Sequence, residues 1–473
     1  MLFNSIEFFL FLPIVFTLYW FILNKNLKSQ NLLILVSSYV FYGWWDYRFL
    51  SLIFLSTVVD YFIGLNIHKQ SSEKKQKLLL WSSVFFNVSF LGFFKYYNFF
   101  VDSWIDLFNY VGYEIKSVWT LNIILPVGIS FYTFQTMSYT IDIYKKKLEP
   151  TKDFISFASF VSFFPQLVAG PIERASNLLP QILNKREFQY EKGVEGLRLI
   201  LWGMFKKVVI ADSLAPVVDN IFNNYESFGG LSLFLGAIYF SFQIYCDFSG
   251  YSDIAIGTSK LFGIELMSNF KFPYFSRNIG EFWRKWHISL SSWFKDYIYI
   301  PLGGSKEGKW KSVRNIFIIF LVSGFWHGAN WTFIFWGCYH AILFLPSYII
   351  KTNRKFKNTI IAENRLLPSP KEFIQVGTTF FLVTIGWIFF RSESIWDSFN
   401  YILYSLKYFN NQVIFESVLL LYILPFIVLD FFLFKNYNKL NKILSIFFWG
   451  GIYVSTLIFF FENSYNSFIY FQF

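Results

Sequence analysis

Long apolar runs recur along the whole chain, and they constrain the fold more than any other feature. They begin near Ile6 and end near Phe461, with no polar stretch between them long enough to form a soluble domain. A helix that crosses a bilayer needs about 20 mainly apolar residues. Of the 473 residues, 55% are hydrophobic and 15% are charged, which is more apolar content than one water-facing domain buries. We therefore expect a single membrane-embedded domain, all-α, over residues 1–473.

The hydropathy pattern predicts about eleven to thirteen membrane crossings. The predicted spans are residues 6–23, 31–45, 49–67, 78–101, 119–144, 194–222, 231–256, 313–326, 331–350, 373–390, 418–434 and 443–461. Residues 154–171 are also apolar, but Pro165, Gly170 and Pro171 interrupt them. This pattern favours a broken or re-entrant segment that protein shelters from lipid.

Basic residues gather in alternate loops, which gives an orientation. Lysines follow the first, third and fifth predicted spans, in loops at residues 25–28, 69–77 and 145–147, whereas the loops at 46–48 and 102–116 carry fewer. The positive-inside rule places the lysine-rich loops in the cytoplasm and the N-terminus outside. We expect a multi-pass protein of the inner (cytoplasmic) membrane, with membrane lipids as partners. The net charge of +11 follows from this topology, so we expect no nucleic-acid partner.

Large apolar residues, most of them aromatic, recur at three- and four-residue steps from Glu281 to Tyr297. The residues of this stripe are Trp283, Trp286, Leu290, Trp293 and Tyr297. Charged residues such as Arg284 lie elsewhere on the helical wheel, which predicts one amphipathic helix in the headgroup plane. His287 borders the stripe, and it either anchors this interfacial helix or contributes to substrate binding.

His327 lies between two strongly apolar runs, with Gly324 and Gly328 on either side and Asn330 one turn later. A polar group at membrane depth is costly unless it has a partner, so such residues are functional candidates. A neutral imidazole can accept and return a proton near neutral pH. His327 is thus a candidate catalytic residue, and the alternative is a hydrogen-bonded packing histidine. His68 and His340 are expected to be structural.

Two carboxylates, Asp247 and Asp253, lie in another apolar run, where they need partners or water. Asp247 and Tyr251 are four residues apart and share a helical face. The carboxylates either line a polar cavity, orient a histidine, or pair with Arg277 or Arg284. The basic loop after Gly303 and Gly304 lacks the Walker spacing, but it is suited to the phosphates of a nucleotide-bearing carrier.

Four segments together carry a family resemblance. They are FPQLVAGPIER at residues 164–174, YCDFSGYSDIAIG at 245–257, FWRKWHISLSSWFKDYIYIPLGGS at 282–305 and SGFWHGANWTFIFWG at 323–337. In these motifs the chain resembles the membrane-bound O-acyltransferases, and most closely the bacterial branch that includes alginate O-acetyltransferases. The resemblance covers most of the chain except about its last hundred residues.

The resemblance implies a ring of helices around a funnel-shaped pore, in which His327 corresponds to the invariant histidine of the family and His287 to its second, less constant one. The donor would be acetyl-coenzyme A or another acyl thioester, with no bound cofactor and no metal. The acceptor would be an extracytoplasmic polysaccharide, served by a serine-hydrolase-like acetyltransferase partner. His327 would act as general base or carry the acyl group. Residues that could support it, as oxyanion donors or in binding, are Asn330, Trp326, Asp247, Tyr251 and Arg284.

Two other classes of protein share the same broad features. A transporter or flippase for a cell-envelope polysaccharide precursor would also have many spans and buried polar residues, but the sequence lacks the duplicated halves that many such folds show. A purely structural assembly subunit would give His327 no chemical reason to be histidine. An O-acyltransferase is the interpretation that explains the motifs best.

Overall fold

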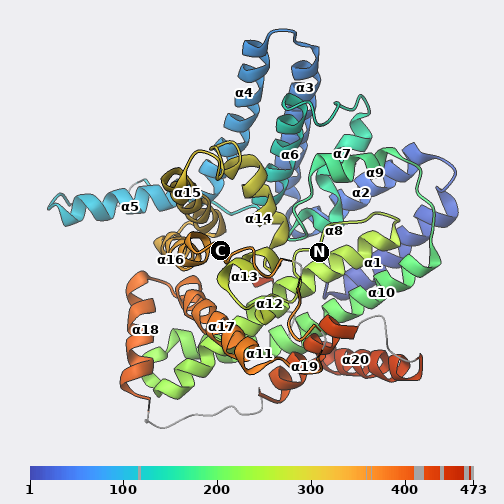
Figure 1. The fold of residues 1–473 in the computed structure, drawn as a ribbon. Coiled ribbons are helices and arrows are strands. Elements are labelled where there is room, and N and C mark those ends of the chain that lie inside the picture. The colour runs from blue at the N-terminus through green and yellow to red at the C-terminus, as the bar shows by residue number, and fades with distance from the viewer. Residues whose placement is uncertain are drawn as a thin grey trace. The chain divides into compact units, whose positions relative to one another are not determined.

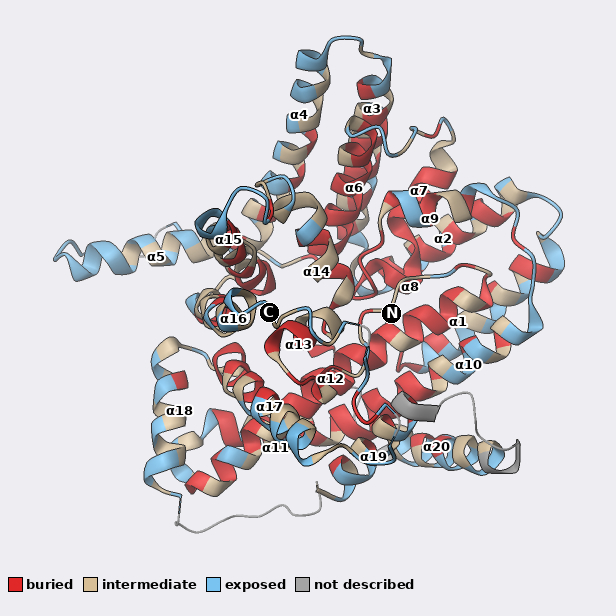
Figure 2. Cartoon of the chain, viewed as in Figure 1, coloured by how far each residue is buried: buried red, intermediate tan, exposed pale blue. Residues whose placement is uncertain are grey.

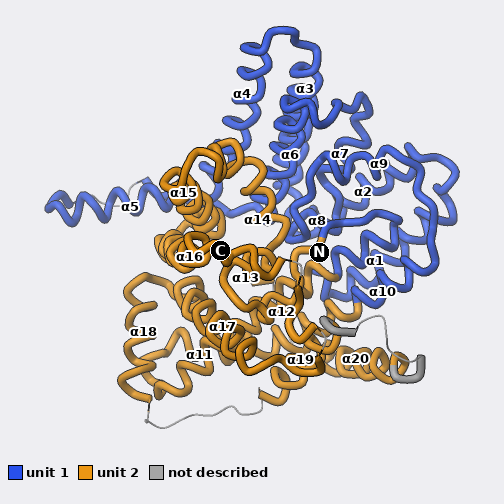
Figure 3. Tube along the Cα trace, in the orientation of Figure 1, with its two compact units in different colours: residues 1–200, 254–267 blue, residues 201–253, 268–473 orange. Residues whose placement is uncertain are grey.

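The computed structural model describes residues 1–114, 119–357, 359–363, 365–409, 420–436, 442–462 and 468–469. Within these ranges every regular element is helical (Figure 1), which confirms the all-α prediction. The chain divides into two compact units (Figure 3). Unit 1 comprises residues 1–200 and 254–267, and unit 2 comprises residues 201–253 and 268–473.

Unit 1 is built mainly from the first ten helices. They are α1 (Ile6–Thr17), α2 (Leu27–Asp46), α3 (Leu50–Lys69), α4 (Glu73–Leu91), α5 (Tyr97–Tyr110), α6 (Ile129–Tyr144), α7 (Phe154–Ser162), α8 (Phe164–Leu167), α9 (Ala175–Leu183) and most of α10 (Tyr190–Met204). Helix α3 packs against α4 and α6, and α2 packs against α7. A buried carboxylate at Asp60 accepts hydrogen bonds from Ser83 Oγ (2.5 Å) and Asn87 Nδ2 (2.8 Å), which ties α3 to α4.

Unit 2 contains the remaining helices. They are a π-helical segment η4 (Phe205–Ala211), α11 (Asp212–Asn223), α12 (Gly230–Leu261, to residue 253), α13 (Ile279–Lys285), α14 (Ile288–Phe294), a second π-helical segment η7 (Lys295–Tyr299), α15 (Lys309–His327), α16 (Trp331–Ile349), α17 (Pro370–Arg391), α18 (Ile395–Lys407), α19 (Leu420–Asn436) and α20 (Lys442–Glu462).

Helices α15 and α16 approach each other backbone to backbone. A Cβ atom added to Gly324 of α15 would lie 2.2 Å from the carbonyl oxygen of Phe333 in α16. A Cβ added to Gly337 of α16 would lie 2.4 Å from the carbonyl oxygen of Phe320 in α15. Only glycine therefore fits at both crossing points. The two glycines set the distance between the helix that ends in His327 and its neighbour.

Five helical segments among the described residues are long and apolar enough to cross a membrane. They are Leu27–Lys69, which joins α2 and α3, Glu73–Tyr110, Gly230–Leu261, Trp331–Ile349 and Pro370–Arg391. Large apolar side chains such as Trp81, Phe85 and Trp104 are exposed on α4 and α5, whereas α12 is largely buried (Figure 2). Exposed apolar surface of this kind suits lipid rather than water. The chain is a polytopic membrane protein, and the number of crossings stays a prediction.

Several predicted boundaries were wrong. The predicted span at residues 119–144 is helical only from Ile129, because Pro126 precedes it and Gly128 has φ 75°, with Leu167 O 2.6 Å from where its Cβ would be. The predicted loop at 102–116 is helical as far as Tyr110, and residues 115 and 116 lie outside the described residues.

Further differences lie in unit 2 and at the boundary of α10. The predicted span at 194–222 is three elements, α10, η4 and α11. Helix α18 was missed, and residues 418 and 419 of the predicted span at 418–434 lie outside the described ranges. The segment 154–171 is broken into α7 and α8, as its prolines predict.

We expect Gly337→Ala to lower the thermal unfolding temperature of the detergent-solubilised protein. The added methyl group would press on the α15 backbone and cost about 1–3 kcal/mol, as overpacking of a close contact does. Gly377→Ala on α17 is the matched control, because no atom lies within 4 Å of its added Cβ. Equal unfolding temperatures for the two variants would show that the α15–α16 contact is not tight.

Candidate active site

His327 is the last residue of α15, and the chain turns immediately after it. Gly328 follows with an extended backbone, and a Cβ at that position would lie 2.0 Å from the Phe333 ring. Asn330 caps α16, because its Oδ1 accepts the Thr332 amide at 3.0 Å and its Nδ2 donates to the carbonyl of Glu393 at 2.9 Å. The flanking glycines at 324 and 328 therefore admit Phe333 of the protein itself, and they fix the turn that ends at His327.

Aromatic rings surround His327 on three sides. The ring centroids of Trp326, Trp336 and Phe390 lie 4.9, 5.2 and 5.2 Å from its own. The side chain is 4% exposed, so bulk water is largely excluded. This aromatic chamber places the imidazole in an apolar environment where an electrostatic interaction with a reacting group is stronger than in water.

His287 lies at a break between α13 and α14. It has φ 43°, a left-handed conformation that is unusual for any residue other than glycine. Backbone hydrogen bonds stabilise this break in the helix: Ile288 N donates to Asn269 O (2.9 Å), and Lys271 N donates to Lys285 O (3.0 Å). Such a strained conformation persists only where the surrounding structure imposes it, and it is found disproportionately at functional sites.

The prediction of one continuous amphipathic helix over Glu281–Tyr297 was wrong, because the left-handed conformation of His287 interrupts the helix. The segment is α13, the break at Trp286 and His287, α14 and then the π-helical η7. Its tryptophans face protein, since Trp286 is 1% exposed and Trp293 is 4% exposed. Trp286 packs on Phe270 and Trp387, with centroid distances of 5.0 and 4.8 Å. The three- and four-residue spacing thus reflects a buried face in two short helices.

The two histidines predicted to be catalytic lie together. Their ring centroids are 6.4 Å apart, and Trp326 contacts both, at 5.8 Å from His287 and 4.9 Å from His327. Phe248 of α12 covers another side of His287 at 4.7 Å. Among the described residues neither ring nitrogen of His287 has a hydrogen-bond partner, and His287 is 1% exposed. Burial lowers the pKa of His287 to about 3, so the imidazole is neutral and offers one donor and one acceptor.

The other predicted residues have contacts that tie the fold together. Asp247 Oδ1 pairs with Lys207 Nζ at 2.6 Å, and its Oδ2 accepts the Ile469 amide at 2.7 Å. Tyr251 is buried against Phe468, with ring centroids 5.0 Å apart. Arg284 Nη1 donates to the carbonyl of Asn353. The cation that pairs with Asp247 is thus Lys207, and neither Arg277 nor Arg284 was the right partner.

Two lysines and two aromatic residues of the site were not predicted from the sequence. Lys206 pairs with Asp253 at 2.6 Å, and Lys207 pairs with both Asp247 and Asp212, so two adjacent lysines hold η4 to α12. Trp336 and Phe390 line the chamber from α16 and α17. The sequence did contain one signal for Trp336, its four-residue spacing from His340, which places the two on one helical face. Their rings are in contact in the structure.

Comparison with known proteins shows the family of this chain. The model of the MBOAT (membrane-bound O-acyltransferase) family matches residues 146–387, which include both histidines. A probable alginate O-acetylase of Pseudomonas syringae pv. tomato is 42% identical over 398 residues, covering 84% of this chain and 73% of the relative. The chain belongs to the membrane-bound O-acyltransferase family.

More distant members of the same family also match. A peptidoglycan O-acetyltransferase of Helicobacter pylori is 39% identical over 427 residues, covering 84% of this chain and 78% of the relative. A teichoic acid D-alanyltransferase of Bacillus subtilis is 29% identical over 288 residues, covering 58% and 70%. The membrane-bound O-acyltransferase assignment confirms the resemblance drawn from the motifs and makes the protein an acyltransferase. It does not favour the transporter alternative.

We expect His287→Asn to reduce the loss of stability in acid. Between pH 6.5 and 3 the unfolded chain binds a proton at His287 that the folded protein does not, so this site lowers the free energy of unfolding as pH falls. Between pH 7 and pH 5 this site lowers the free energy of unfolding by about 2 kcal/mol. Thermal unfolding of wild type and variant at both pH values measures it. An equal acid shift in the two proteins would contradict a buried, neutral His287.

Proposed function

We propose that this acyltransferase moves acetyl groups from a cytoplasmic thioester to hydroxyl groups of an extracytoplasmic polysaccharide. The observation that carries this proposal is the meeting of His287 and His327 in one buried aromatic chamber. The named activities of the alginate and peptidoglycan relatives support acetyl as the group and a polysaccharide as the acceptor. Acetyl-coenzyme A is the proposed donor, and it is a substrate rather than a bound cofactor.

His327 is the proposed general base. Its imidazole takes the proton from an acceptor hydroxyl as the hydroxyl oxygen attacks the thioester carbonyl carbon. The carbon–sulfur bond then breaks, the oxygen ester forms, and the proton passes from His327 to the departing thiolate. No proton or electron pair is left over, so the imidazole is neutral again at the end of the cycle.

His287 is the proposed donor to the oxyanion of the tetrahedral intermediate. As a neutral imidazole with no hydrogen-bond partner in the described part of the chain, it has one N–H to donate. The ring separation of 6.4 Å allows a small reacting group to lie within reach of both histidines. Asn330, also considered from the sequence, already donates its amide to Glu393, which leaves it the role of helix cap. Fixed donors aimed at developing charge commonly contribute more to catalysis than any other single effect.

The proposed direction of transfer follows from the topology that the lysine loops predict, and the proposed partner follows from the family resemblance. The protein resides in the inner membrane with its N-terminus outside, and the donor approaches from the lysine-rich side. A serine-hydrolase-like acetyltransferase outside the membrane is the proposed partner that completes delivery to the polysaccharide.

We expect His327→Ala to lower polysaccharide acetylation by at least about 100-fold, the usual contribution of a positioned acid–base group. The measurement is alkali-released acetate from the envelope polysaccharide of cells that carry the variant in place of wild type. Membrane protein level is checked in parallel. His68→Ala is the matched control, because His68 is an exposed histidine at the end of α3. Normal acetate release by His327→Ala would remove His327 from the chemistry.

A further inference from the structure

A two-residue segment close to the C-terminus lies in the interior of unit 2. Phe468 and Ile469 are 1% and 5% exposed, and we refer to this pair as the C-terminal contact. Ile469 N donates a hydrogen bond of 2.7 Å to Asp247 Oδ2, across 222 positions of the sequence. Residues with this burial belong to the core, although they lie far along the chain from their partners.

The Phe468 ring packs against one turn of α12. Its centroid lies 5.0 Å from that of Tyr251 and 5.7 Å from that of Phe248. Residues three or four apart on a helix share a face, so Phe468 covers both rings together. Asp247, one turn before Tyr251, accepts the Ile469 amide. The C-terminal contact thus holds this turn of α12 by a packed ring and a hydrogen bond.

Phe248 connects this turn of α12 to the candidate active site. Its ring centroid lies 4.7 Å from that of His287 and 4.9 Å from that of Phe270. Phe248 is fully buried, so its position depends on the side chains packed around it. Among the described residues neither ring nitrogen of His287 has a hydrogen-bond partner. Packing therefore holds the His287 imidazole in place, and Phe248 is part of that packing.

The carboxylate of Asp247 depends on the Ile469 amide. Its Oδ1 pairs with Lys207 Nζ at 2.6 Å, and its Oδ2 accepts the amide. Asp247 is itself buried, and a buried oxygen that loses its donor is costly. Because Asp247 and Phe248 are adjacent residues of α12, loss of the amide would disturb the same turn that loss of the Phe468 ring disturbs.

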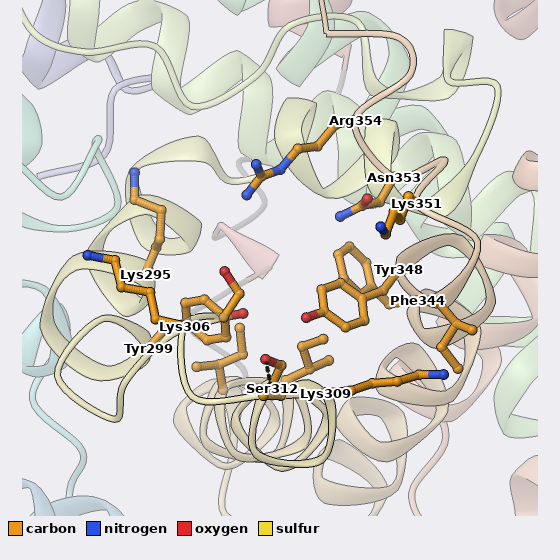
Figure 4. Close-up of a pocket in the computed structure, with 15 residues that line it drawn as sticks. Lys295, Tyr299, Lys306, Lys309, Ser312, Phe344, Tyr348, Lys351, Asn353 and Arg354 are labelled. Atoms are coloured by element: carbon orange, nitrogen blue, oxygen red, sulfur yellow. Dashed lines mark hydrogen bonds between the residues drawn. The ribbon is translucent and has the colours of Figure 1, made fainter.

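The C-terminal contact is separate from the pocket of about 770 Å³ at the start of α15 (Figure 4). That pocket is lined by η7, the turn before α15, the helices α15 and α16, and the segment after α16. Neither α12 nor the C-terminal contact contributes a side chain to its lining. A change at Phe468 should therefore act at His287 and leave this pocket unchanged.

We propose that Phe468 and Ile469 are positioning residues for His287. Phe468 supports Phe248 against the His287 ring, and the Ile469 amide fixes the turn of α12 that carries Phe248. Both residues act through α12 and not on the substrate. This inference rests on the proposed function for the role of His287 as oxyanion donor. A catalytic group displaced by about 1 Å can lower the rate by about 100-fold.

Chemical modification of His287 tests the proposal without a measurement of activity. The full-length protein in nanodiscs is treated with diethyl pyrocarbonate, which modifies neutral imidazoles, and the rate at His287 is followed by mass spectrometry. Phe468→Ala should raise this rate at least about tenfold, because the space it leaves makes local opening around Phe248 easier. Phe240→Ala is the matched control and should leave the rate unchanged. Phe240 is also a fully buried residue of α12, and it packs against Phe222 at 5.7 Å.

Acetyl transfer in proteoliposomes gives a second readout. Phe468→Ala should lower kcat at least about tenfold and leave KM for acetyl-coenzyme A within about twofold, because a displaced oxyanion donor weakens binding of the transition state alone. Phe468→Leu fills most of the space and should restore most of the rate. Ile469→Pro removes the amide donor and should lower kcat further than Ile469→Val, which keeps it.

Three results would overturn the proposal. The first is equal modification of His287 in wild type and Phe468→Ala. The second is an equal increase in Phe468→Ala and Phe240→Ala, which would show a general loosening of α12. The third is a change in KM with kcat unaffected. If Phe468→Ala does not accumulate in the membrane, Ile469→Pro and Ile469→Val provide the same comparison. A wild-type protein that transfers no acetyl group would refute the proposed function, and the modification of His287 would still decide the positioning role.

Discussion

The close packing of α15 against α16 is the contact on which the candidate active site depends. Gly324 and Gly337 allow each backbone to touch the other, and Gly328 accommodates the Phe333 ring at the turn. Because α15 ends at His327 and α16 begins with its cap at Asn330, this contact fixes where the imidazole lies relative to Trp336. A larger residue at either glycine would separate the helices and enlarge the aromatic chamber.

Buried ion pairs hold α12, the helix that contributes Phe248 to the site. Lys206 and Lys207 in η4 pair with Asp253 and Asp247 of α12, and Phe248 of the same helix contacts His287. Removing one member of a buried ion pair leaves an uncompensated charge, which is far more destabilising than the pair is stabilising. These ion pairs therefore fix the position of α12 relative to η4. The neutral His287 is kept in its strained conformation by the backbone hydrogen bonds around it.

The helical membrane fold was predicted from the sequence, and the two histidines singled out there lie together in the structure, but their local geometry was not predicted. His327 could be singled out as a functional candidate because an ionisable side chain between apolar runs is costly to bury and is usually kept only for a function. The break at His287 was not, since it depends on hydrogen bonds to Asn269 and Lys271, which lie more than a dozen residues earlier in the chain. The partner of Asp247 was also hidden, because Lys207 is far from it in sequence and lies in a π-helical segment. The spacing of apolar residues along a helix predicts which face of the helix is buried, but it does not identify the residues that cover that face.

Acetyl transfer by the purified wild-type protein in proteoliposomes tests directly whether the protein is an O-acetyltransferase. Acetyl-coenzyme A labelled in the acetyl group is supplied with an oligosaccharide acceptor and, in a parallel reaction, with the extracytoplasmic partner added. We expect the label to leave the thioester and to be recovered as an alkali-labile oxygen ester on the acceptor or the partner. Bound donor whose acetyl group stays on sulfur in both reactions would contradict this expectation.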